Sequence, residues 1–196
     1  MEMDPKQKEA ENSEIETKFP FQSLEDVLAR LDANGAVQLM ARTFEHNLLL
    51  DTVDRALFAR GCRLRLRQIG NQRILTFKRT QKLENGIAYR EEIESDFSDL
   101  DNMQLIFSRL GYEPFFIYEK YRQVYQLEGT KVMVDETPIG LYVEIEGADE
   151  ASIHAVSDKL GLNWGSRIDQ SYQALFADWA AASGYDGKHM VFTQTG

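Results

Sequence analysis

Glu14-Ile15-Glu16-Thr17-Lys18 alternates charged and uncharged side chains in the way expected of a β-strand with one charged face. Successive side chains of a strand point to opposite faces, so the two glutamates and the lysine share one face. A solvated strand gives the same alternation. The pattern returns, however, because Glu-Ile-Glu recurs at 92–94 and 144–146, and basic runs occupy 63–67 and 120–122. Strands with one charged face throughout the chain need a common explanation.

Composition sets the class of protein. With 196 residues, 43% hydrophobic and 11% aromatic, the chain is long enough for one domain with a sizeable core. Its net charge of -10 argues against a nucleic-acid or anionic-membrane partner, so any anion site must be local. Cys62 is the single cysteine and cannot form an intramolecular disulfide, and Met1 to Ser13 is too polar for a signal peptide. No stretch approaches a membrane span, so we expect a soluble cytoplasmic protein.

The order of elements predicts an α+β domain. We expect a flexible lead over 1–12, the domain over 13–183 and a flexible tail over 184–196. Strands are expected at 14–19, 36–52, 62–69, 73–80, 87–97, 115–127, 131–136 and 141–146. Helices are expected after Ser23 and after Ser98, as a short turn at 53–60, and at 149–160 and 170–182. Gly70-Asn71 and Glu128-Gly129 indicate hairpin turns.

Eight antiparallel strands can close into a barrel with a usable interior. The positions that alternate with the charged ones have the opposite parity along each strand. They form an apolar face suited to packing under helices, with residues such as Phe19, Leu66, Val134 and Ile145. The charged parity must then face either bulk water or an enclosed lumen. We therefore expect an eight-stranded antiparallel closed β-barrel with helices packed outside and the charged set inside.

The charged set separates its acids from its bases. Acids occur as Glu-x-Glu pairs, and bases occur as Arg-x-Arg and Lys-x-Arg pairs. Carboxylates suit Mg²⁺ or Mn²⁺, whereas guanidinium and ammonium groups suit phosphate oxygens. A polyphosphate with its divalent cation satisfies both. The set is Glu14, Glu16, Lys18, Arg63, Arg65, Arg67, Lys78, Arg90, Glu92, Glu94, Lys120, Arg122, Asp135, Glu144 and Glu146.

From Ser13 to Ala182 the sequence resembles the CYTH family, the class IV adenylate cyclases and thiamine triphosphatases, also called triphosphate tunnel metalloenzymes. The resemblance is carried by Glu14 to Lys18, by Leu64-Arg65-Leu66-Arg67, Leu75 to Lys78, Arg90 to Glu94, Lys120-Tyr121-Arg122, Asp135 to Glu146 and Ser171-Tyr172. It is closest to the class IV cyclase branch. Two positions depart from the family: Arg63 adds an inward cation, and Asp169-Gln170 stands where a lysine often precedes Ser-Tyr.

The resemblance implies roles for individual residues. It implies metal ligands at Glu14, Glu16, Asp135, Glu144 and Glu146 for Mg²⁺ or Mn²⁺. It implies phosphate contacts from Lys18, Arg65, Arg67, Lys78, Arg90, Lys120 and Arg122, to which Arg63 is added as the extra inward cation. The catalytic roles fall to Lys18, Lys78 and Glu92. Family members often form dimers, so a homodimer is also implied.

Three activities are compatible with the charged set. Water attack on the terminal phosphorus of inorganic, nucleoside or thiamine triphosphate would make the protein a triphosphatase. Attack by the ribose 3′-hydroxyl of ATP would make it an adenylate cyclase, but no residue identifies an adenosine pocket. A polyphosphate- or nucleotide-binding protein without catalysis is the remaining alternative. We expect hydrolysis of a small-molecule triphosphate.

Overall fold

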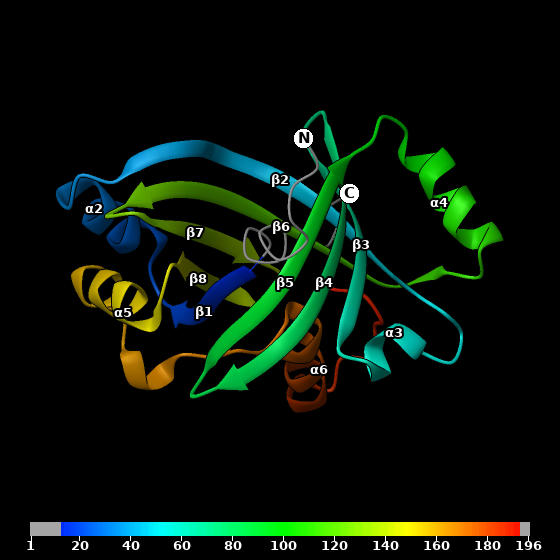
Figure 1. Cartoon of the computed structure of the whole chain (residues 1–196). Helices are drawn as coiled ribbons and strands as arrows, with labels where there is room; N and C mark the ends of the chain where they lie inside the picture. The colour runs from blue at the N-terminus through cyan, green and yellow to red at the C-terminus, as the bar shows by residue number, and fades with distance from the viewer. Residues whose placement is uncertain (1–12, 193–196) are drawn as a thin grey trace.

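The computed structural model describes residues 13–192 and confirms the predicted closed barrel of eight antiparallel strands (Figure 1). The predicted lead over 1–12 lies outside the described residues, as do residues 193–196. The strands are β1 (Ser13–Phe21), β2 (Val37–Asp51), β3 (Cys62–Ile69), β4 (Gln72–Glu84), β5 (Ile87–Asp96), β6 (Glu113–Leu127), β7 (Thr130–Thr137) and β8 (Gly140–Gly147). Around the barrel they follow the order β1-β5-β4-β3-β2-β6-β7-β8, and β8 pairs with β1.

Tight turns connect the hairpins as the sequence predicts. Ile69 pairs with Gln72 across Gly70-Asn71, and Gly70 adopts a φ of 53°. Leu127 pairs with Thr130 across a turn in which both central residues have positive φ. Two positive φ values match the twist of the flanking strands. These turns set the register that brings the charged residues of neighbouring strands together.

The seam between β1 and β8 shows how the register orders the interior. Lys18 lies opposite Glu144, and Glu16 lies opposite Glu146. Residues directly opposite one another on paired strands project from the same face of the sheet. The charged parity of β1 is therefore continuous with that of β8, which confirms the common inner face predicted from alternation.

Five α-helices and a short 3-10 turn lie outside or at the ends of the strands in the described chain. They are α2 (Leu24–Ala33), α3 (Ala56–Ala59), α4 (Leu100–Arg109), α5 (Glu150–Lys159), η1 (Trp164–Ser166) and α6 (Tyr172–Ser183). None of these helices combines the length and the apolar content that a bilayer crossing requires.

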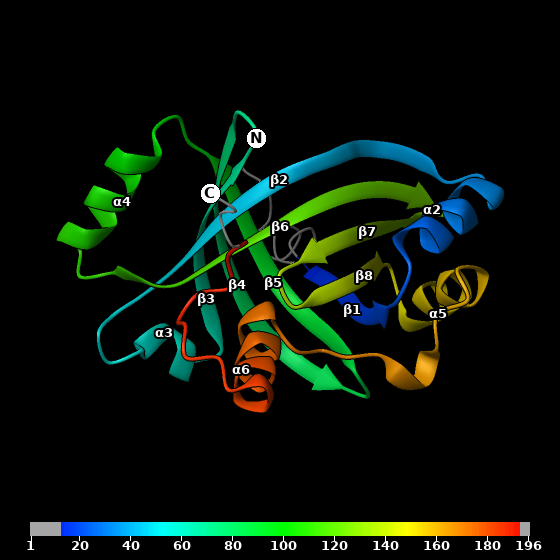
Figure 2. The same cartoon turned by 180° about the vertical axis from the view of Figure 1, so that it is seen from behind.

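The main core lies outside the barrel, beneath α2 and α5. Figures 1 and 2 show these two helices beside the ends of β1, β7 and β8. Phe19 and Ile145 from the strands pack with Leu31 of α2 and Ile153 of α5, and each is almost fully buried. Complete burial of such a side chain contributes about 1.5–3 kcal/mol. The apolar parity of β1, β7 and β8 thus holds the helices on the outer face.

Helix α4 covers a second apolar area. Its Met103 and Phe107 pack on Leu48, Leu50 and Leu66 of β2 and β3. The sequence predicts that this helix begins after Ser98, but the residue that caps it is the next one along the chain.

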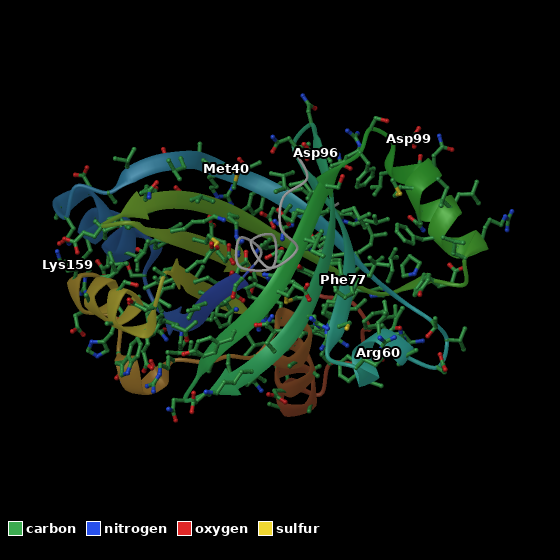
Figure 3. All side chains as sticks on the ribbon, viewed as in Figure 1. Met40, Arg60, Phe77, Asp96, Asp99 and Lys159 are labelled. Carbon is green, nitrogen blue, oxygen red and sulfur yellow. The ribbon has the colours of Figure 1, made fainter. Side chains whose placement is uncertain are left out.

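The cap of α4 is Asp99, because its carboxylate accepts the backbone N–H of Asn102 (2.9 Å). Figure 3 shows Asp99 where the helix begins.

The helices do not cover the whole apolar face of the strands, however. Ile93 on β5 is 47% exposed, and its cross-strand partner Phe77 on β4, labelled in Figure 3, is only partly buried.

Within the tail predicted over 184–196, the chain contacts the barrel at Met190. Met190 is 1% exposed and joins a core with Phe116 and Phe176. Its N–H donates to Ile117 O (3.0 Å), and its carbonyl accepts from Glu119 N (2.9 Å). Strand β7 pairs with β6 only from Tyr121 onward, so the earlier backbone groups of β6 are available to this segment.

Candidate active site

A cavity of about 170 Å³ lies inside the barrel, lined by side chains from all eight strands and from the start of α6. Every residue predicted to bind phosphate, bind metal or act in catalysis lines it, except Asp135. Those residues are Glu14, Glu16, Lys18, Arg63, Arg65, Arg67, Lys78, Arg90, Glu92, Lys120, Arg122, Glu144 and Glu146. Residues up to 132 positions apart in sequence therefore meet in one enclosed space.

Glu144 joins two cations near the seam of the barrel. Its Oε1 lies 2.8 Å from Lys18 Nζ, and its Oε2 lies 2.6 Å from Arg122 Nη2. Burial alone would raise the pKa of Glu144, but Lys18 and Arg122 lower that pKa well below its usual range. Glu144 is therefore a carboxylate at neutral pH, with each oxygen held by a different cation.

Asp135 lies behind the cavity wall rather than in it. It accepts from Lys120 Nζ (3.0 Å), from Arg122 Nε and Nη2 (both 2.6 Å) and from the Tyr172 hydroxyl (2.5 Å), and its exposed fraction is 0%. Tyr172 comes from α6, whose position the local sequence does not specify. Both oxygens of Asp135 are held by these donors, so Asp135 anchors Lys120 and Arg122, and its role as a metal ligand stays a prediction.

Lys78 organises a second cluster. Its Nζ lies 2.7 Å from Glu92 Oε2 and 2.9 Å from Glu14 Oε2, although the second contact lacks hydrogen-bonding geometry. Glu16 is 3.8 Å away and pairs with Arg90.

The two carboxyl groups that flank Lys78 have opposite pKa shifts. Burial, followed by the interaction with Glu92, raises the pKa of Glu14 to about 7. Burial alone would raise the pKa of Glu92, but Lys78 and a hydrogen bond with Glu14 lower it. Near neutral pH the pair can therefore hold one proton between one acid and one carboxylate.

Strand β3 contributes a row of three arginines. Arg65 lies 3.3 Å from Glu92 Oε1 and donates to the Tyr118 hydroxyl (3.2 Å) and Thr76 Oγ1 (3.1 Å). Arg63 and Arg67 flank it on the same face, and within residues 13–192 neither forms an ion pair. The Nε of each is buried without a hydrogen-bond partner in that range. Arg63 donates through Nη1 to Cys62 O (2.8 Å), so alternation on one strand presents an ion-paired arginine between two whose charge is not paired within that range.

The sequence and fold can now be compared with known proteins. The sequence model of the CYTH domain matches residues 12–172. This chain belongs to the CYTH family. The match spans every strand that lines the cavity.

Relatives of this CYTH protein share both sequence and fold. A provisionally named adenylate cyclase of Methanocaldococcus jannaschii is 26% identical over 134 residues, which are 68% of this chain and 75% of the relative. A structure from Vibrio parahaemolyticus, with the same provisional name, superposes with a TM-score of 0.73 at 19% identity, over 84% of this chain and 97% of that one. A Hippeastrum adenylyl cyclase, also provisionally named and described as having a dominant triphosphatase activity, gives a TM-score of 0.64 at 20% identity, over 84% and 95%. At these identities the structures show a shared fold.

Sequence reasoning missed Glu45 of the CYTH barrel. It faces inward from β2 with an exposed fraction of 0%, 3.6 Å from Lys120 Nζ and 3.9 Å from Arg122 Nε. The parity of Glu45 and Asn47 carries the signal, but the following run of leucines conceals the alternation of β2. Lys131 was also missed. It lines the cavity 3.3 Å from Glu146 and shares the parity of Asp135, so alternation on β7 could have revealed it.

The segment before α6 supplies neutral groups where the family often has a lysine. Gln170 and Ser171 line the cavity, as does Gln173 in the first turn of α6, and Ser171 caps α6 by accepting from Ala174 N. Arg167, the cation nearest to this position in the sequence, does not line the cavity. Its guanidinium lies over the Trp164 ring, 4.5 Å from the centroid. Two amides and a hydroxyl therefore complete this wall.

The donor set of the cavity fits a hard divalent cation. Glu16 and Glu146 face one another across the seam, and Glu14 lies two residues from Glu16 on the same face. Carboxylate oxygens are preferred ligands of Mg²⁺ and Mn²⁺. Among residues 13–192, no three Asp, Glu, His or Cys side chains converge on one point, because the carboxylates are turned toward lysines and arginines. The chemistry of the donors fits the predicted ion.

Proposed function

We propose that this CYTH protein is a divalent-metal-dependent enzyme that hydrolyses small triphosphate-containing substrates. One observation carries the proposal: nine lysine and arginine side chains line the cavity against six glutamates, an excess of three cations. The whole chain has a net charge of -10, so this excess is local. An enclosed surplus of donors with positive charge suits a polyanion of small size.

The cations can divide the work on the phosphate chain. Within the described residues, the Nε of Arg63 and the Nε of Arg67 have no hydrogen-bond partner, and these two arginines would bind phosphate oxygens. Lys120 and Arg122 are fixed by Asp135, which orients them in advance of binding. Preorganised donors stabilise charge that develops on phosphate oxygens without further rearrangement.

The carboxylates would hold the ion. Glu14, Glu16, Glu144 and Glu146 line the cavity and would be its ligands, whereas Asp135 does not line it and would anchor Lys120 and Arg122. When bound, Mg²⁺ or Mn²⁺ would neutralise phosphate charge and favour ionisation of water.

Hydrolysis needs little covalent chemistry from the chain. Water attacks the terminal phosphorus, the bond to the bridging oxygen breaks, and orthophosphate separates from the remaining phosphate chain. Lys18 and Lys78 would stabilise the charge on the transferring group. Glu92 would hold the ammonium of Lys78 in place through its 2.7 Å contact. These are the catalytic roles that we assign.

Adenylate cyclase activity is the second candidate, because the Methanocaldococcus jannaschii and Vibrio parahaemolyticus relatives bear that name. The activity described for the Hippeastrum protein favours hydrolysis. The cation-rich cavity serves both reactions, which differ in the attacking oxygen and the phosphorus attacked.

The test is incubation with inorganic triphosphate, ATP or thiamine triphosphate, each with Mg²⁺ or Mn²⁺. Orthophosphate and cyclic AMP are measured in the same reactions. We expect orthophosphate as the main product. Formation of cyclic AMP and diphosphate from ATP would instead identify the protein as an adenylate cyclase. Thermal stabilisation by a triphosphate with neither product would identify a binding protein.

A further inference from the structure

Glu45 is a fully buried carboxylate without a hydrogen bond to either oxygen in the described chain. It lies on β2 opposite Lys120 of β6, and its nearest charged neighbours are Lys120 at 3.6 Å and Arg122 at 3.9 Å. Burial of an ionised carboxylate without hydrogen bonds is unfavourable, so such a position needs surrounding cations. Burial alone would raise the pKa of Glu45, but Lys120, Arg122 and Arg65 lower it, so the group is charged.

The two cations nearest to Glu45 belong to the cavity wall. Lys120 and Arg122 line the cavity, whereas Glu45 and Asp135 do not. Both carboxylates therefore act on these cations from buried positions outside the cavity lining. Asp135 does so through short hydrogen bonds, but Glu45 does so at ion-pair distance only. Replacement of Glu45 by a neutral side chain would leave Lys120 and Arg122 anchored by Asp135.

We infer that Glu45 is a positioning residue that limits the affinity of the cavity for phosphate chains and so allows the product to leave. Its negative charge attracts Lys120 and Arg122 away from the cavity and offsets part of their attraction for an anion. The inference rests on the proposed function, because it assumes that a triphosphate occupies this cavity.

The test compares three variants with the wild type by calorimetric titration of inorganic triphosphate and of diphosphate without divalent metal. Glu45→Gln keeps the shape and removes the charge, and we expect about tenfold tighter binding of both anions, the effect of one charge-assisted contact. Glu45→Asp keeps the charge and should bind nearly as the wild type does. Glu136→Gln is the matched control, because Glu136 pairs with Arg42 away from the cavity and its loss changes net charge equally. It should bind as the wild type does.

Steady-state kinetics separate this role from a structural one. With Mg²⁺ or Mn²⁺ present, Glu45→Gln should lower both KM and kcat, since substrate and product are both held longer. A structural role would instead raise KM or abolish the melting transition. Unchanged or weaker binding in Glu45→Gln, tighter binding in Glu45→Asp, or loss of folding in Glu45→Gln would each overturn the inference. Absence of triphosphate binding by the wild type would instead overturn the proposed function.

Discussion

Lys18 of β1 lies directly opposite Glu144 of β8, and their side chains form a 2.8 Å ion pair inside the barrel. This pair lies at the seam where the first strand meets the last. Lys18 and Glu144 are each less than 10% exposed, so the contact is shielded from bulk water. Closure of the sheet and assembly of the charged site are therefore the same structural event.

Replacement of Lys18 by Gln should lower kcat for triphosphate hydrolysis by about 10²–10³, the usual effect of removing one donor to developing charge. Glu144 would retain Arg122, so the fold should persist. Product release and circular dichroism measure the two effects. Lys159→Gln, on the exposed side of α5, is the control and should be fully active. Full activity in Lys18→Gln would remove Lys18 from the catalytic group.

Arg65 should not tolerate replacement by lysine. Its guanidinium reaches Tyr118, Thr76 and Glu92 at once, which a single ammonium cannot reproduce. We expect Arg65→Lys to lower kcat/KM by about tenfold and Arg65→Ala to lower it further, consistent with lost charge-assisted bonds. Arg73→Lys, in the same hairpin but outside the cavity, should match the wild type. Equal kinetics for Arg65→Lys and the wild type would show that planar donors are not required.

Glu16→Gln tests the metal assignment. Loss of one carboxylate ligand should raise the Mn²⁺ concentration for half-maximal activity by about 10–100-fold. Metal titrations at saturating triphosphate measure this shift, and Glu91→Gln on the outer parity of β5 serves as control. An unchanged Mn²⁺ requirement in Glu16→Gln, with activity retained, would assign the ion to other ligands.

Tyr172→Phe should destabilise the protein by about 1–3 kcal/mol, because Asp135 loses a buried hydrogen-bond donor. The ring remains in place over Lys18 and Lys120, whose Nζ atoms lie 4.7 and 5.0 Å from its centroid. Urea unfolding measures the change in free energy. Tyr185→Phe, at an exposed site, should have little effect by comparison. Equal unfolding midpoints for the two variants would show that the hydroxyl contact contributes nothing.

Asp51 should make stability depend on acid pH. Burial alone would raise its pKa, but N–H donors from Leu57, Phe58 and Thr52 lower it. A lowered pKa in the folded state means that this contribution is present above the unfolded value of about 3.9 and is lost as pH falls through the folded value. Melting temperatures should show Asp51→Asn less stable than the wild type at pH 7, with the difference shrinking below pH 4.

The exposed Asp186→Asn is the control for this series and should follow the wild type at each pH. A constant difference between Asp51→Asn and the wild type across the acid range would mean that the carboxylate charge is not the stabilising feature. The N–H contacts to Asp51 would then stabilise the fold without any contribution from its negative charge.

The interior membership of the charged residues could be predicted because strand alternation is a local property. Arg63, Arg65 and Arg67 share a face whatever the strand packs against. The same argument failed for β2, where consecutive leucines concealed the phase of Glu45. It also failed to separate Asp135 from Glu144, since both have inward parity and differ only in what covers them.

The sequence by itself determined the strand count, the inner face and most residues of the cavity, because hydrophobic and charged periodicity act within a single strand. Tertiary structure alone decided which carboxylate meets which cation. Barrel closure sets the pairing across the seam, and α6 brings Tyr172 onto Asp135 from 37 residues away. The position of Met190 against β6 was likewise decided by unpaired backbone groups that only the assembled sheet leaves available.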